Sequence, residues 1–329
     1  MNQTSEHQRR ALACLKALAS GDATGKQTET LSHAEVHHWY PEGISGFQGQ
    51  PGTIIPRYKG NQKHEWRIGE TTDDTEQTLG VAQVLVSTRE PSHTDFGRQL
   101  LKCRKSLHPG VKSLWTLHES GDPSRVAFDG DGCGAAMRAA PVGILYSPNR
   151  IEELIRVVRE SSIPTHGGQL AICAAAAVAG AVSAAIEGWA PKDVMEFAIQ
   201  AATRAEVFTP PLKDKATPTM ADAIWRMYND LSTDETLMAS NLADTYFPDS
   251  PQTKVPLAIN LAILTESSER TILLAANIGG DSDSVASIGG AIAGALRPDK
   301  VNDDWSDVVQ SVNQEALVGI AEALVKLRH

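Results

Sequence analysis

The chain contains 329 residues, of which 41% are hydrophobic and 21% charged, so it can bury a sizeable core and general disorder is excluded. Its 30 basic and 40 acidic residues give a formal net charge of −10, which has the wrong sign for non-specific binding to nucleic acids. The 4 cysteines lie far apart and show neither a zinc-binding nor a disulfide spacing. Because the N-terminus is polar and lacks a secretory signal, we expect a cytoplasmic protein with free thiols.

Helical periodicity dominates the chain, and the alternating patterns typical of strands are nearly absent. The sequence predicts helices at about 8–20, 75–88, 92–105, 151–163, 169–187, 192–205, 219–231, 255–264, 268–278, 284–296 and 305–327. The first helix is expected to stop at Gly21 and to lead into a polar loop. Residues 33–69, rich in glycine and aromatic side chains, are expected to form a long irregular lid or insertion. The predicted fold class is all-α.

Small residues are concentrated in two of the predicted helices. The apolar run Ala171–Ile186 is too short to cross a membrane comfortably and is expected to be a buried core helix. Gly290 and Gly294 lie four residues apart, on one face of their helix. They are expected to let a second helix approach closely.

Two acidic segments begin helices that are widely separated in the sequence. The first, ETTDDTEQTL at 70–79, offers Thr72 as an N-cap followed by Asp73 and Asp74 in the first turn. The second, NIGGDSDSVASIGG at 277–290, places Asp281, Asp283 and Ser284 where a loop enters a helix.

Each acidic segment alone is explained by an ordinary capped helix start. Together they offer only hard oxygen donors, which suit Mg²⁺ or Mn²⁺ and do not suit soft metals. If the two helix starts face each other, a pair of divalent ions would neutralise the carboxylates and could activate a water molecule. Such a site would close across most of the chain, which favours a single domain over residues 1–329.

Several segments in the same order resemble the ADP-ribosylglycohydrolase family, an all-α group that includes the dinitrogenase-reductase-activating glycohydrolase and the ADP-ribosyl-acceptor hydrolases. They are GDATGKQTE at 21–29, TDDT at 72–75, GCGAAMRAAPVG at 132–143, TH at 165–166 and GGDSDS at 279–284 with the following GAIAGA. The resemblance implies a single compact orthogonal helical bundle. It also implies hydrolysis of a glycosidic bond at the anomeric carbon of a ribose.

The resemblance further implies roles for individual residues. The ligands of a binuclear Mg²⁺ or Mn²⁺ centre would be Thr72, Asp73, Asp74, Asp281, Asp283 and Ser284. Glu29 matches a glutamate near the metals, and Asp74 or Glu29 would take the proton from the attacking water. The loop that holds the phosphates and distal ribose of ADP-ribose would contain Asp129, Gly130, Asp131, Gly132, Cys133 and Gly134, with His166 nearby.

The sequence also departs from the family pattern. Ser284 stands where threonine is common, which keeps the hydroxyl, and Cys133 stands where asparagine is frequent. If Asp129 and Asp131 face inward, they would repel a diphosphate and favour a hydroxyl-rich or cationic ligand. Arg138 is expected to be structural and to tie neighbouring loops together.

Three functions therefore stay open. The first is removal of ADP-ribose from a modified protein side chain or a small acceptor. The second is hydrolysis of a nucleoside-like ribosyl compound, and the third is a catalytically silent role like that of the family's lens-crystallin branch. We expect a monomer or small homo-oligomer that does not bind membranes.

Overall fold

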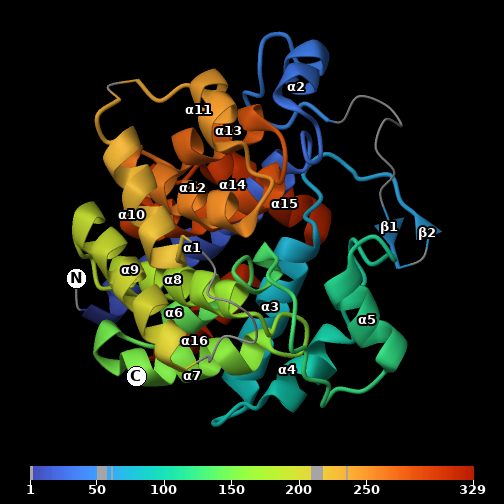
Figure 1. Cartoon of the computed structure of the whole chain (residues 1–329), viewed down its shortest axis with the longest axis vertical. Helices are drawn as coiled ribbons and strands as arrows, with labels where there is room; N and C mark the ends of the chain where they lie inside the picture. Colours follow the sequence, from blue (N-terminus) through green and yellow to red (C-terminus); the bar gives the residue numbers. More distant parts are fainter. Residues whose placement is uncertain (1–2, 50–57, 61, 209–217, 235) are drawn as a thin grey trace.

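The computed structural model describes residues 3–49, 58–60, 62–208, 218–234 and 236–329, and within them it confirms the all-α class (Figure 1). The helices of the first half are α1 Gln3–Gly25, α2 His33–Trp39, α3 Asp73–Ser87, α4 His93–Leu100, α5 Lys112–Ser120, α6 Ala140–Leu145 and α7 Ile151–Ser162. Those of the second half are α8 Gln169–Ile186, α9 Pro191–Phe208, α10 Met220–Leu231, α11 Ala239–Tyr246, α12 Pro251–Leu264, α13 Ser268–Ile278, α14 Ser282–Leu296, α15 Asp303–Asn313 and α16 Leu317–Lys326.

Short elements complete the described fold. They are the 3₁₀ turns Cys133–Ala135, Pro148–Arg150 and Pro298–Lys300 and the antiparallel pair β1 Tyr58–Lys59 and β2 Gln62–Lys63. In Figure 1 the pair of strands lies near α5 at one side of the bundle, and Lys59 forms a bridge with Lys105 in the segment between α4 and α5. The hairpin is therefore attached to the helical body.

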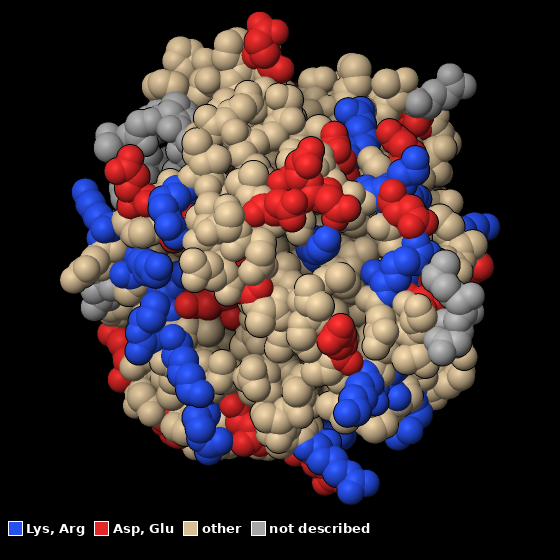
Figure 2. Space-filling model, turned by 180° about the vertical axis from the view of Figure 1, so that it is seen from behind, with Lys and Arg blue, Asp and Glu red and all other residues tan. Residues whose placement is uncertain are grey.

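The centre of the bundle is built from α1, α8 and α14, which pack on one another and on the helices around them. Helix α8 is long and apolar enough to cross a membrane by composition, but 89% of it is buried inside the fold. The expectation of a buried core helix is confirmed. On the face shown in Figure 2, lysine and arginine side chains are interspersed with acidic ones, so the charge is mixed there.

Helices α1 and α14 touch through their backbones. A methyl group added at Gly290 would lie 2.5 Å from the carbonyl oxygen of Ala17, and one at Gly294 would lie 2.5 Å from that of Ala13. From the other side, a methyl at Gly21 would lie 2.2 Å from the carbonyl oxygen of Ala286. The close-approach role expected of Gly290 and Gly294 is confirmed.

The expected end of the first helix at Gly21 is wrong. Helix α1 continues to Gly25, and residues 21–25 are all buried. The glycines in this stretch permit contact with α14 and do not end the helix, since a methyl at Gly25 would lie 2.3 Å from the carbonyl oxygen of Ser282. Local sequence signals for a helix end were outweighed by tertiary packing.

Other boundaries also differ from the predictions. Residues 33–69 contain α2 and the small hairpin, while positions 50–57 and 61 of the expected lid lie outside the described residues. Helix α4 ends at Leu100, and the helix expected over 305–327 is divided at Gln314, whose φ of 57° is left-handed. Helices α5, α6 and α11 were not predicted.

The close contact between α1 and α14 predicts that adding one methyl group between them destabilises the protein. We expect Gly21→Ala to lower the free energy of unfolding by about 1–3 kcal/mol, because the new methyl must push two backbones apart. The matched control is Gly319→Ala in α16, where nothing lies within 4 Å, and helix propensity should stabilise the protein by up to about 1 kcal/mol. Urea unfolding of both variants checks this, and equal effects would contradict the packing argument.

Candidate active site

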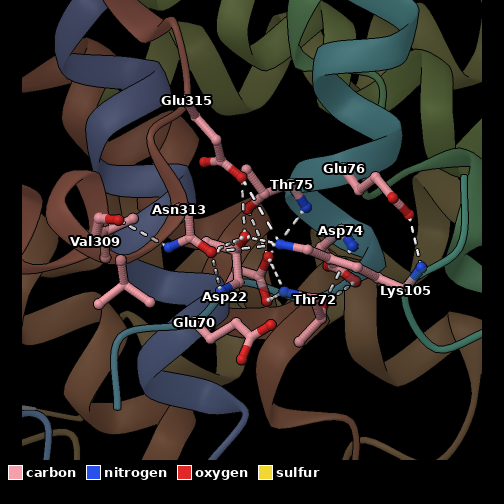
Figure 3. Close-up of polar contacts among 12 residues, drawn as sticks. Asp22, Glu70, Thr72, Asp74, Thr75, Glu76, Lys105, Val309, Asn313 and Glu315 are labelled. Carbon is pink, nitrogen blue, oxygen red and sulfur yellow. Dashed lines mark hydrogen bonds and ion pairs between the residues drawn. The ribbon is translucent and has the colours of Figure 1, made fainter. Parts of the chain in front are cut away.

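The start of α3 is held by a buried carboxylate from α1 (Figure 3). The Asp22 oxygens accept hydrogen bonds from the Thr72 amide at 3.0 and 2.9 Å, and from the Thr75 amide at 3.0 Å and hydroxyl at 2.5 Å. Thr72 is the N-cap, as predicted, and its hydroxyl accepts a bond of 3.2 Å from the Asp74 amide. Asp22 thus satisfies amide groups that have no partner within the helix.

A lysine lies beside this anchor. Lys105 donates from its ammonium to the Thr71 hydroxyl at 2.6 Å and to Asn313 Oδ1 at 3.4 Å, and it lies 3.9 Å from Glu315 (Figure 3). Burial raises the pKa of Asp22, while the hydrogen bonds from Thr75 and Thr72 and the charge of Lys105 act in the opposite direction. The first turn of α3 is therefore fixed by α1 and by the link between α15 and α16.

The starts of α3 and α14 meet, as hypothesised from the sequence. The Ser287 hydroxyl on α14 donates to Asp74 Oδ1 at 2.6 Å, and both side chains are buried. Asp283 is also buried, with 3% of its surface exposed, and its carboxylate interacts electrostatically with those of Asp74 and Asp281. The carboxylates predicted to converge are therefore brought together at one place.

Glu29 joins this group through the turn that follows α1. The Thr30 amide donates to the Gly280 carbonyl and the Gly280 amide to the Leu31 carbonyl, each at 2.7 Å, so this turn is bonded to the loop before α14. Glu29 forms an ion pair with Lys26, whose ammonium lies 5.1 Å from the centre of the Trp66 ring. We refer to Glu29, Asp73, Asp74, Asp281 and Asp283 as the acidic centre.

Most of the acidic centre is short of positive charge. Burial raises the pKa of Asp73 to about 7, although the charge of Lys26 acts against this shift. Burial, together with the charges of Asp22 and Asp73, raises the pKa of Asp74 well above its usual range. Burial and the charge of Glu29 raise the pKa of Asp283 in the same way. An added cation would therefore be stabilised at this position.

These shifts predict how the stability of the metal-free protein depends on pH. Because the folded-state pKa of Asp73 is raised from 3.8 to about 7, its contribution is fully present below pH 3.8 and is lost as the pH rises through about 7. Asp74 and Asp283 shift in the same direction. We expect urea unfolding in a chelator to give lower stability at pH 8 than at pH 5, and a smaller loss with excess Mg²⁺. Equal losses with and without Mg²⁺ would contradict the prediction.

Asp281 differs from its neighbours because it already has a cation. Its Oδ2 lies 2.6 Å from the ammonium of Lys254 and accepts a hydrogen bond of 3.1 Å from the thiol of Cys133. Burial acts to raise the pKa of Asp281, but Lys254 and these bonds bring it below its usual value. Burial and the charge of Asp281 raise the pKa of the Cys133 thiol, which argues against a nucleophilic thiolate.

The predicted phosphate loop lies against His166. Methyl groups added at Gly132 and Gly134 would lie 3.2 and 2.9 Å from His166 Nε2, so the glycines make room for the imidazole. The Thr165 hydroxyl lies 2.8 Å from His166 Nδ1. Burial and the charge of Arg138 lower the pKa of His166 to about 3, so the ring is neutral at physiological pH.

The two acids of this loop are exposed. The Asp131 carboxylate lies against Gly168 at the start of α8, where an added methyl group would be 1.9 Å from its Oδ1. Asp129 is held through its backbone, since its carbonyl oxygen accepts a hydrogen bond of 3.0 Å from the Gly167 amide.

Arg138 has the structural role expected of it. The residue is 1% exposed, and its guanidinium donates to Gln77 Oε1 at 2.6 Å, to the Ser161 carbonyl at 2.9 Å and to the Thr165 hydroxyl at 2.7 Å. These bonds connect α3 with the end of α7 and the turn before α8. Arg138 therefore holds together the elements that carry Asp74 and His166.

The acidic centre fits a divalent cation by its chemistry. Among the described residues, no group of three or more acidic, histidine or cysteine side chains is already arranged to hold a metal ion. The donor set is nevertheless made entirely of oxygen, and its buried carboxylates lack enough neighbouring positive charge. Asp73, Asp74 and Asp283 meet both criteria, oxygen donors and too little neighbouring positive charge. Asp281 differs because it already forms an ion pair with Lys254.

Sequence reasoning missed the residues that support the site: Asp22, Lys26, Lys105, Lys254 and Ser287. Asp22 lies in the GDATG segment, and its signal was an acid between two glycines. The prediction of a polar loop after Gly21 places Asp22 in that loop, whereas the structure places it in α1. The lysines and Ser287 have no local pattern that distinguishes them from ordinary surface or helix residues.

A model of the family described as ADP-ribosylglycohydrolase matches residues 3–329 of the chain. The chain belongs to the ADP-ribosylglycohydrolase family. It is 28% identical to the uncharacterized protein YegU of Escherichia coli, with 97% of each chain covered. It is 27% identical to ADP-ribosylarginine hydrolase Tri1 of Serratia proteamaculans, covering 97% of this chain and 80% of the relative. Human ADP-ribosylhydrolase ARH3 is 22% identical, with coverage of 89% and 86%.

A solved structure has the same fold. The chain named ADP-ribosylglycohydrolase-related protein complex matches with a TM-score of 0.72 and 22% identity, covering 99% of this chain and 100% of that one. The expected helical bundle of the ADP-ribosylglycohydrolase type is thereby confirmed. Membership of the family supports a glycohydrolase acting on ADP-ribosylated substrates, and such enzymes generally depend on divalent metals.

Proposed function

We propose that this chain is a metal-dependent hydrolase that cleaves the glycosidic bond at the anomeric carbon of ribose and releases ADP-ribose from a modified protein side chain or small acceptor. The observation that carries the proposal is the meeting of the α3 and α14 starts, where buried carboxylates need positive charge. The groups that would hold two Mg²⁺ or Mn²⁺ ions belong to Thr72, Asp73, Asp74, Asp281, Asp283 and Ser284. We also propose that residues 1–329 act as one cytoplasmic domain.

When bound, such ions would supply Lewis acidity for activating water and orienting the ribose hydroxyls. Between Glu29 and Asp74, Glu29 is the better placed to accept the proton of the water, because its side chain is 23% exposed, although its Oε2 is paired with Lys26. Asp74 is 2% exposed, and its Oδ1 already accepts a hydrogen bond from Ser287. We therefore assign proton transfer to the Glu29 carboxylate and give Asp74 the role of holding charge.

The loop of Asp129, Gly130, Asp131, Gly132, Cys133 and Gly134 is proposed to bind the substrate. The neutral ring of His166 packs behind its glycines and keeps their backbone in place. The Cys133 thiol donates to Asp281, so it supports a candidate ligand rather than presenting a hydrogen-bond donor to the substrate. This contact explains how the loop accommodates cysteine at a position where the family often has asparagine.

A nucleoside-like ribosyl substrate is a second candidate because of Asp131. Its carboxylate lies at the start of α8, a helix end that would otherwise favour an anionic group. A bound phosphate there would meet a like charge. A catalytically silent role has less support, since all the acidic side chains of the proposed centre are retained.

The test uses calorimetry and hydrolysis together. ADP-ribose is titrated into the protein with Mg²⁺, and the absence of binding at millimolar ligand would reject the ADP-ribosyl substrate. ADP-ribosylated arginine, ADP-ribosylated serine and free nucleosides are then compared with Mg²⁺ or Mn²⁺. We expect release of ADP-ribose that disappears in Asp283→Ala. Hydrolysis of nucleosides alone would establish the second candidate, and no hydrolysis of any substrate would leave only the silent role.

A further inference from the structure

Lys254 is an ion-pair partner of the acidic centre that comes from a separate helix. It lies in the first turn of α12, and its ammonium is 2.6 Å from Asp281 Oδ2. The side chains of Lys254 and Asp281 are only 17% and 20% exposed, so water screens this pair less than a surface pair. The Cys133 thiol donates to the same Asp281 oxygen at 3.1 Å. Both Lys254 and Cys133 therefore engage this oxygen.

The backbone fixes the lysine in this position. The Asp281 amide donates to the Pro248 carbonyl at 3.2 Å, and a methyl added at Gly280 would lie 2.9 Å from Pro248. The loop before α14 is therefore packed against the loop before α12. A cation in a first helical turn is disfavoured by the helix dipole, so its position there needs a compensating partner. Asp281 is that partner.

We propose that Lys254 is a built-in counter-ion that competes with a divalent cation for Asp281, so that the second of two ions binds more weakly than the first. This inference rests on the proposed function. The first ion would occupy the side of the centre formed by Asp73, Asp74 and Asp283. Within the described part of the chain, these carboxylates accept hydrogen bonds from Gln77, Ser287 and the Ser284 amide, and Lys26 acts on Asp73 and Asp283 through its charge. The second ion must displace the ammonium from Oδ2 and then remain close to a positive charge.

Replacing Lys254 by a neutral residue should therefore raise the affinity for the second ion. A lysine with a purely structural role would not produce this increase. Removing the charge at position 254 eliminates the competitor and the repulsion between two cations. We expect the affinity for the second ion to rise about tenfold or more, which corresponds to about 1.4 kcal/mol. A lysine that only supported the fold would give unchanged or weaker metal binding when replaced.

The experiment measures metal binding by the whole chain after treatment with a chelator. Mn²⁺ and Mg²⁺ are titrated calorimetrically into wild type, Lys254→Met, Lys254→Gln and Lys254→Arg. Methionine keeps the apolar length of the side chain, glutamine keeps a polar end, and arginine keeps the charge. The matched control is Lys16→Met, which breaks an ion pair of similar length, 2.7 Å, with Asp303 at the surface. Circular dichroism establishes that each variant is folded.

The inference is supported if the methionine or glutamine variant binds the second ion more tightly than wild type does. The Lys254→Arg and Lys16→Met variants should then bind it with wild-type affinity. Unchanged or weaker binding in both neutral variants, while wild type binds two ions, overturns it and leaves the proposed function intact. The inference is also supported if a neutral variant binds two ions while wild type binds only one. Absence of metal binding in every variant overturns both the inference and the metal dependence in the proposed function.

Discussion

Replacing Asp283 by asparagine should reduce metal-dependent hydrolysis of an ADP-ribosyl substrate by about 10³-fold, because one carboxylate ligand is lost and several kcal/mol of metal-assisted stabilisation go with it. The side chain is buried at the start of α14, and the substitution keeps its shape. The fold should therefore remain. Initial rates at saturating Mg²⁺ and the metal content after dialysis measure the effect.

The same substitution should make the metal-free protein more stable. The raised pKa of Asp283 means that its ionised form is disfavoured by burial and by the charges of Glu29 and Asp74. Asparagine cannot ionise, so the folded state is relieved of this repulsion at neutral pH. A variant that loses activity and metal but gains resistance to urea cannot be explained by misfolding.

The control for Asp283 is Asp303→Asn in α15. Asp303 is an acidic residue whose side chain is 75% exposed and whose ion pair with Lys16 lies at the surface. Its replacement should change neither metal content nor rate, and stability should change by no more than about 1 kcal/mol. If Asp283→Asn retained the wild-type metal content and rate, the assignment of the acidic centre as a metal site would be refuted.

Much of the helical architecture could be predicted because its signals are local. The spacing of apolar side chains in α7 and α10 repeats within each helix, and α8 is a continuous apolar run, so a single sequence contains both signals. The N-cap role of Thr72 is equally local, since the cap and the amide it binds are two residues apart. The meeting of the α3 and α14 starts could be hypothesised only because hard oxygen donors were concentrated at both.

Features that depend on tertiary contact could not be predicted in the same way. Gly21 has the local character of a helix end, yet α1 continues through it to Gly25. The glycine is needed because α14 packs too closely on this position to leave room for a side chain. Lys254 has no motif, and its importance arises from a loop contact that brings α12 beside Asp281. The position of the Asp131 carboxylate against Gly168 could likewise not be read from the sequence, so the direction of that side chain stayed open.

Removal of the Asp22 carboxylate should strongly destabilise the fold. We expect Asp22→Ala to lower the free energy of unfolding by about 2–4 kcal/mol, since the Thr72 amide and the Thr75 amide and hydroxyl lose their acceptor. Relief of repulsion with Asp74 acts in the opposite direction. The loss of the acceptor outweighs it, because several buried donors are left without a partner while Asp74 keeps its bond from Ser287. Urea unfolding measures the change.

Asp22 also positions a candidate ligand, so its removal should affect more than stability. Thr72 and Asp74 belong to the turn that Asp22 holds, and we expect Mg²⁺ affinity to fall along with the free energy of unfolding. Asp22→Asn keeps one acceptor oxygen and should cost less than alanine in both measurements. The control is Asp95→Ala, which removes a carboxylate bonded to Ser92 at the start of α4, far less buried, and should cost about 1 kcal/mol without changing metal affinity. Equal losses of stability at positions 22 and 95 would show that the buried bonds to α3 add nothing to an ordinary helix cap.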